Sequence, residues 1–182
     1  MYEGNAGIDN PDNEWTPESA ERLFIFCQFD RAMPYEKVRW AYDRLMEAGF
    51  YSFEKLRSLS LDELTKILKI VGLRFPRETA GFLYENIRMF TGERLMKMSR
   101  DDLAKECKGF GMKLASMFHN RIHGTQYAII DVHVDRYLKE HGCKSSNYKK
   151  KEEFLTEMAT SQGKTVEQLD WEIWNANRIG NR

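Results

Sequence analysis

The chain lacks the features that mark several protein classes. Its cysteines are few, odd in number and widely spaced (Cys27, Cys107 and Cys143), so they offer neither a disulfide framework nor a pair of zinc ligands. No stretch approaches the roughly 20 consecutive apolar residues of a transmembrane helix, and the acidic, polar N-terminus does not resemble a signal peptide. We therefore expect a reduced, cytoplasmic protein with no metal or other cofactor and no association with a membrane.

The chain also lacks an excess of basic residues, because its 28 Lys and Arg are balanced by 28 Asp and Glu. The distribution is uneven: residues 1–20 hold five acids and no Lys or Arg, which leaves 28 basic and 23 acidic residues in the remainder, a net charge of +5. Basic residues outnumber acidic ones between Arg88 and His123. This surplus allows a few contacts with phosphate groups but is not a strong nucleic-acid footprint.

Length and composition predict one folded domain after a short tail. With 182 residues, of which 42% are hydrophobic and 31% charged, the chain can bury a sizeable core. We expect residues 1–15 to be an acidic flexible tail and residues 16–182 to form a single all-α domain.

Capping signals predict the positions of the helices. Thr16 and Pro17 start a helix that runs to Phe29, and a second follows Pro34. A capping box starts a third helix at Ser60. Further helices are expected over residues 76–91, 100–123 and 132–141, and C-terminal helices over about 150–178. We expect residues 92–98 to be a linker and the lysine-rich residues 144–151 to be a solvated linker, with contact to a DNA backbone as the alternative.

Residues 100–123 have the pattern of a helix-hairpin-helix. Ser99 is a suitable N-cap, and Gly109 stops the first helix. Gly109 and Gly111 permit a tight turn and a close approach of the backbone to another surface. The second helix begins near Met112, where the first amides lack an intrahelical partner and can bind an anion such as a DNA phosphate. An ordinary helical hairpin with a glycine turn is the alternative.

Two polar residues stand at helix starts on either side of an apolar run. Lys113 falls in the first turn of the second hairpin helix, and Asp131 follows the apolar residues 127–130. Asp131 is itself a suitable N-cap for a helix that ends before Gly142. Because most helix lysines are solvated and most acids at helix starts are only caps, spacing alone leaves their function open.

Two segments resemble the hairpin and the following acidic loop of the DNA glycosylase superfamily: GFGMKLASMF and YAIIDVHVDRYL. More narrowly, the chain is similar to the compact type 2 branch of 8-oxoguanine DNA glycosylase/AP lyases. Supporting matches are GLRF with the following RETAGFLYENIR, and LDWEIW near the C-terminus. The resemblance implies an all-α, two-lobed fold with the active site in the cleft and an aspartate loop over about residues 127–133.

The resemblance also implies roles for residues at matching positions. Lys113 matches the catalytic lysine of the family, which predicts lyase activity, and Asp131 matches its catalytic aspartate. The implied contacts with DNA come from the hairpin and the aspartate loop: Gly109, Gly111, Met112 and His133.

Other implied roles concern the base that is removed. Trp171 and Trp174 are expected to form a wall of the base pocket, with structural packing as the alternative. Arg182 stands where this branch typically closes the pocket with a terminal lysine. Arg31 is the candidate wedge that fills the gap left by an extruded base, and a plain loop arginine is the alternative. Relatives with an iron–sulfur cluster need four closely spaced cysteines, and none follows Cys143.

The chemistry of these residue types fits the implied activity. Cleavage of an N-glycosidic bond builds positive charge on the sugar, which a nearby carboxylate stabilises. A lysine attacks the anomeric carbon only as a neutral amine, then forms a Schiff base that permits β-elimination. We therefore expect a monomeric base-excision repair enzyme that extrudes 8-oxoguanine from duplex DNA and attacks with Lys113.

Two alternatives stay open. One is a glycosylase of the same fold for another damaged base, such as an oxidised pyrimidine or a deaminated base. The other is a non-catalytic helix-hairpin-helix module that only binds DNA. In the module, Lys113→Gln would leave the DNA affinity nearly unchanged, and no strand scission would accompany binding.

Overall fold

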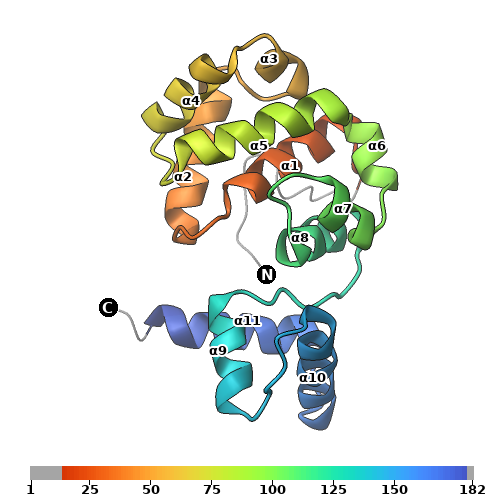
Figure 1. Cartoon of the computed structure of the whole chain (residues 1–182). Helices are drawn as coiled ribbons and strands as arrows, with labels where there is room; N and C mark the ends of the chain where they lie inside the picture. The colour runs from red at the N-terminus through yellow and green to blue at the C-terminus, as the bar shows by residue number, and fades with distance from the viewer. Residues whose placement is uncertain (1–13, 180–182) are drawn as a thin grey trace. The chain divides into compact units, whose positions relative to one another are not determined.

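The computed structural model describes residues 14–179, and in this range the chain is all-helical, as expected (Figure 1). Residues 1–13 of the expected tail, and Arg182, lie outside the described residues. The chain divides into two compact units between Leu114 and Ala115. Each unit is described by itself below.

Within the described residues, the first unit holds seven helices and the first residues of an eighth. Its helices are α1 (Pro17–Phe29), α2 (Tyr35–Glu47), α3 (Phe53–Arg57), α4 (Leu61–Ile70), α5 (Pro76–Met89), α6 (Gly92–Lys97) and α7 (Arg100–Glu106). Helix α8 (Met112–His123) begins in this unit and continues into the second. The expected helix starts at Thr16, Ser60 and Ser99 are confirmed, because each of these side chains accepts a hydrogen bond from a backbone amide in the first turn.

Helix α1 is the centre of the first unit. All its residues from Leu23 to Phe29 are buried, and the helix contacts α2, α5 and α6 (Figure 1). A helix that is buried around its circumference needs no polar face, which explains the nearly unbroken apolar sequence LFIFCQF. The end of α1, at Asp30, is therefore fixed by the core around it.

One carboxylate joins two short helices to α1. Glu21 Oε2 accepts from the Phe53 amide at 2.9 Å, and Glu21 Oε1 accepts from the Gly92 amide at 3.3 Å. These amides open α3 and α6, neither of which the sequence analysis expected. The expected linker over residues 92–98 is wrong because Thr91 caps a helical turn there, its side chain accepting from the Arg94 amide.

As far as Ile179, the second unit contains three helices after α8: α9 (Val132–Glu140), α10 (Tyr148–Ser161) and α11 (Val166–Ile179), which contact one another. Its buried core comes from these helices and the loops beside them: Ala128, Ile130, Val134, Leu138, Cys143, Leu155, Ala159, Leu169 and Ile173. The expected solvated linker over residues 144–151 is wrong in its second half. Asn147 accepts from the Lys150 amide and starts α10 at Tyr148.

The three cysteines are buried thiols. Burial raises the pKa of the Cys107 thiol to about 12, so this thiol stays protonated and unreactive at neutral pH. None of the helices within residues 14–179 is long and apolar enough to span a bilayer.

The contact between α6 and the start of α1 gives a test of this packing. A Cβ atom on Gly92 would lie 1.9 Å from the backbone oxygen of Pro17, whereas a Cβ on Gly81, inside α5, would meet nothing within 4 Å. We expect Gly92→Ala to lower the free energy of unfolding by about 1–3 kcal/mol. Gly81→Ala, the matched control, should raise it by about 0.5–1 kcal/mol through its higher helix propensity. Urea denaturation followed by circular dichroism measures both, and equal effects would contradict the packing described.

Candidate functional site

The turn between α7 and α8 requires one glycine and leaves open space at the other. Gly109 has φ +66°, and a Cβ on it would lie 2.5 Å from the Phe82 ring. A Cβ on Gly111 would meet nothing within 4 Å. Gly109 is therefore fixed by both backbone conformation and packing, while Gly111 keeps the start of α8 accessible.

Asn86 on α5 clamps this turn. Its Oδ1 accepts from the Lys108 amide at 2.8 Å, and its Nδ2 donates to the Lys108 carbonyl at 2.9 Å. The same Nδ2 donates to Gln28 Oε1 on α1 at 3.1 Å. The buried amide thus pairs with both backbone groups of Lys108 and ties the turn to α1 and α5. The sequence analysis missed Asn86; the available signal is a polar residue beside Leu83 and Ile87 on the buried face of a helix.

Phe110 joins the hairpin to the core. Its ring stacks on that of Phe24 in α1, with 4.5 Å between centroids and 9° between planes. Apolar residues on both sides of the hairpin turn are buried, among them Leu103, Cys107 and Leu114. The turn is therefore held by packing on one side and by the Asn86 clamp on the other.

Lys113 forms an ion pair with Asp30. Its Nζ donates to Asp30 Oδ2 at 2.6 Å, and the two side chains are 28% and 20% exposed, respectively. Asp30 is the C-cap of α1. In the sequence, Asp30 falls between the expected helix that runs to Phe29 and the one that follows Pro34, and no role was predicted for it. The signal that could have found it is an acid at a helix C-terminus, where the helix dipole disfavours negative charge.

Arg31, the candidate wedge, lies beside the hairpin. It forms an ion pair with Glu78 at 3.1 Å, and its guanidinium lies 4.7 Å from the centroid of the Phe82 ring. Phe82 is also the ring that faces Gly109. The arginine is thus engaged within the first unit, and its role as a wedge stays a prediction.

In the second unit, Asp131 is the N-cap of α9, as expected. Its Oδ1 accepts from the His133 amide at 2.8 Å and from the Val134 amide at 2.9 Å. Gly142 follows α9 with φ +93°, consistent with the expected helix end. The carboxylate of Asp131 is therefore fixed in orientation by two N–H groups at the positive end of a helix.

Side chains from α8 and α10 hold the extended residues before Asp131. Asn120 Nδ2 donates to the Tyr127 carbonyl at 2.7 Å, and Asn120 Oδ1 accepts from the Tyr127 amide at 3.0 Å. The Tyr148 hydroxyl accepts from the Ile130 amide at 3.0 Å and donates to the Ala128 carbonyl at 2.8 Å. The sequence analysis missed these contacts, since it assigned Tyr148 to a linker.

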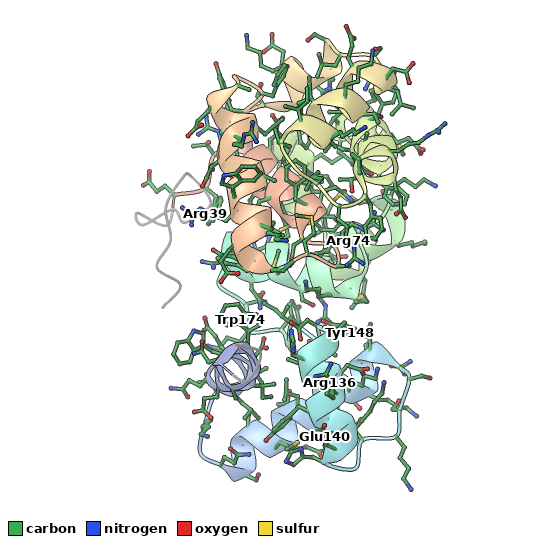
Figure 2. All side chains as sticks on the ribbon, turned by 90° about the vertical axis from the view of Figure 1, so that its left-hand side faces the viewer. Arg39, Arg74, Arg136, Glu140, Tyr148 and Trp174 are labelled. Atoms are coloured by element: carbon green, nitrogen blue, oxygen red, sulfur yellow. The ribbon has the colours of Figure 1, made fainter. Side chains whose placement is uncertain are left out.

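The remaining predicted residues of this unit differ in exposure. The backbone amide of His133 takes part in the cap of α9, and its ring Nδ1 is buried without a hydrogen-bond partner among the described residues. Trp171 is 43% exposed on α11, and Trp174, on the same helix (Figure 2), is half-buried. Lys113 belongs to the first unit and these residues to the second, so their shared function stays a prediction.

The fold is shared with DNA glycosylases of known structure. The chain is similar to the crystal structure of the 8-oxoguanine DNA glycosylase of Thermotoga maritima, with a TM-score of 0.74 and 28% identity, covering 92% of this chain and 84% of that chain. It is also similar to the Methanocaldococcus jannaschii 8-oxoguanine glycosylase/lyase in complex with a 15mer DNA containing 8-oxoguanine. That comparison gives a TM-score of 0.77 and 22% identity over 96% of this chain and 87% of that chain. The fold is that of the helix-hairpin-helix DNA glycosylases.

Sequence similarity narrows this class to a family. Residues 12–164 match the family described as 8-oxoguanine DNA glycosylase. The chain is 33% identical over 129 residues to the 8-oxoguanine DNA glycosylase/AP lyase of Thermotoga maritima, which is 64% of this chain and 62% of that protein. The similarity therefore spans less than two thirds of the relative's length. The chain belongs to the 8-oxoguanine DNA glycosylase family.

The two glycines of the hairpin should respond differently to substitution. Gly109→Ala forces a side chain into a left-handed conformation and into the Phe82 ring, so we expect the free energy of unfolding to fall by about 2 kcal/mol or more. Gly111→Ala, two residues away, should change it by no more than about 0.5 kcal/mol. Urea titrations of both variants test this, and a large loss in Gly111→Ala would show that the turn is packed differently.

Proposed function

We propose that this chain is a bifunctional enzyme of base-excision repair, which removes 8-oxoguanine from duplex DNA and then nicks the strand at the abasic site. The observation that carries the proposal is Lys113, whose amine is held at the start of the second hairpin helix in a chain of this family. The relatives at 33% identity carry both activities in their names, 8-oxoguanine DNA glycosylase/AP lyase. The proposed partner is duplex DNA with one damaged base, bound by a single copy of the chain.

Lys113 is the proposed nucleophile. Its amine nitrogen attacks the anomeric carbon, and the bond from this carbon to the base breaks with the base as leaving group. The attached nitrogen then loses a proton, and its lone pair breaks the bond from the anomeric carbon to the ring oxygen, which takes up a proton, so that an iminium forms on the opened sugar. The iminium makes the adjacent carbon acidic, so loss of a proton there and β-elimination of the 3′ phosphate cut the strand. Two features of the described geometry support this role: the side chain is only partly exposed, and its amine is fixed by Asp30 rather than extended into solvent.

Asp131 is the proposed electrostatic partner of the reaction. Positive charge develops on the sugar as the glycosidic bond lengthens, and an ionised carboxylate stabilises it. The two amide donors on Asp131 Oδ1 support this role because they hold the anion in one orientation, which avoids reorganisation during the reaction.

The hairpin is the proposed clamp for the DNA backbone. The first amides of α8 follow Gly111, where no side chain blocks access, and the helix dipole favours an anion at this end. The Asn86 clamp supports this role because it fixes the turn before DNA arrives, so less ordering is needed on binding.

Borohydride trapping tests the proposed function. The protein is incubated with a duplex that carries a single 8-oxoguanine, then reduced, so that a Schiff base becomes a permanent covalent adduct. We expect the unchanged chain to form the adduct and Lys113→Gln to form none, because glutamine has no amine. Lys69→Gln is the matched control: it removes a lysine charge at an exposed position on α4, outside the hairpin, and should keep adduct formation.

The same assay separates the alternatives. An adduct with a preformed abasic site but none with 8-oxoguanine would retain the lyase chemistry and overturn the assigned lesion. Duplexes with an oxidised pyrimidine or a deaminated base then identify the substrate. Binding to all of these duplexes with no adduct on any of them would overturn the enzyme in favour of a DNA-binding module.

A further inference from the structure

The carboxylate that contacts Lys113 stands in an electrostatically unfavourable place for its own helix. Asp30 caps the C-terminal end of α1, where unpaired carbonyl groups give the helix a partial negative charge. Local preference therefore does not account for an acid at this position. The ammonium of Lys113, whose Nζ lies 2.6 Å from Asp30 Oδ2, compensates this negative charge. The two residues are 83 positions apart in the sequence, so their charges complement each other only through the fold.

The packing around the pair fixes its geometry. Phe24 of α1 stacks on Phe110 of the hairpin, and Gln28 of α1 is linked through Asn86 to the backbone of Lys108. These contacts set the register between the end of α1 and the start of α8. The Asp30–Lys113 contact thus differs from a surface ion pair, in which two long side chains meet without support.

Two other charged residues named above, Arg31 and Asp131, have partners of their own. Arg31, the residue after Asp30, is turned towards Glu78 and the ring of Phe82. The candidate catalytic carboxylate, Asp131, has its own partners in the amides of α9. The two acids therefore have different environments, which suits different tasks: one faces N–H dipoles and the other faces the amine itself.

We propose that Asp30 is a positioning residue that aims the amine of Lys113 and accepts its proton before the attack. This inference rests on the proposed function. In the step, a proton moves from Nζ of the ammonium to Oδ2 of the carboxylate, which leaves a neutral amine and a neutral carboxylic acid. The freed lone pair on Nζ then forms the bond to the anomeric carbon, while the bond from this carbon to the base breaks and its electron pair leaves with the base. On a preformed abasic site, the electron pair of the sugar carbonyl moves onto its oxygen instead. Because Nζ and Oδ2 already share a hydrogen bond, the transfer needs no intervening group.

Asp30→Asn isolates this role. Asparagine keeps the shape and an oxygen that accepts a hydrogen bond, but it loses the charge and the ability to take the proton. The first measurement is the single-turnover rate of borohydride trapping on a duplex with one abasic site. The second is the affinity for a duplex that carries a tetrahydrofuran in place of the abasic sugar, which cannot form a Schiff base.

We expect Asp30→Asn to trap at least about 10-fold more slowly than the unchanged chain, with the affinity for the tetrahydrofuran duplex within about 2-fold. The rate deficit should narrow as the pH is raised, because solvent base then removes the proton. Asp30→Glu should restore part of the rate. Asp43→Asn, which removes an ion-paired acid from α2 in the same unit, is the matched control and should trap at the unchanged rate.

Several results would overturn the inference. They are an unchanged or faster rate in Asp30→Asn, a deficit that is constant across pH, or a parallel loss of affinity and of thermal stability, which indicates a structural role. If the unchanged chain itself forms no adduct with the abasic duplex, the proposed function fails. A failure of the inference alone is recognised by normal trapping in the unchanged chain and its loss in Lys113→Gln.

Discussion

Two asparagine side chains hold the loops that carry the candidate site residues. Asn86 pairs with both backbone groups of Lys108 in the hairpin, and Asn120 pairs with both backbone groups of Tyr127 in the loop before Asp131. A primary amide offers a donor and an acceptor, as a peptide group does. Each asparagine side chain therefore makes the two hydrogen bonds that a neighbouring backbone segment would otherwise make. A typical hydrogen bond of this kind contributes about 0.5–1.5 kcal/mol to stability. Both clamps stand on helices, which makes the loops rigid.

Local rules were sufficient for most of the helix boundaries. The caps at Thr16, Ser60 and Asp131 depend on residues within one turn, so the sequence predicts them without knowledge of the fold. The predictions of a linker were wrong where a capping residue lay in a polar, charged segment. The sequence analysis gave more weight to the lysines after Gly142 than to Asn147, and it treated residues 92–98 as a linker despite Thr91. In both segments the capping side chain determined the structure.

The candidate site could be predicted only in part, for a physical reason. Lys113 and Asp131 lie in recognisable motifs, and the family match gives these motifs their context. Asp30 and Tyr148 lie in no motif, because their roles depend on tertiary contacts: Asp30 meets Lys113 across 83 positions, and Tyr148 reaches the Asp131 loop across 18 and 20. Such partners become visible only when packing brings distant helices together. The supporting residues of a site are therefore harder to predict than the residues that perform its chemistry.

Peptide mapping of the trapped adduct shows which residue forms the covalent bond to DNA. The adduct formed on an 8-oxoguanine duplex is reduced, digested with protease and nuclease, and sequenced by tandem mass spectrometry. We predict that the residual sugar is attached to Lys113, with Lys108 in the same hairpin unmodified. Attachment to any other amine would contradict the assignment, even if the strand is cleaved normally.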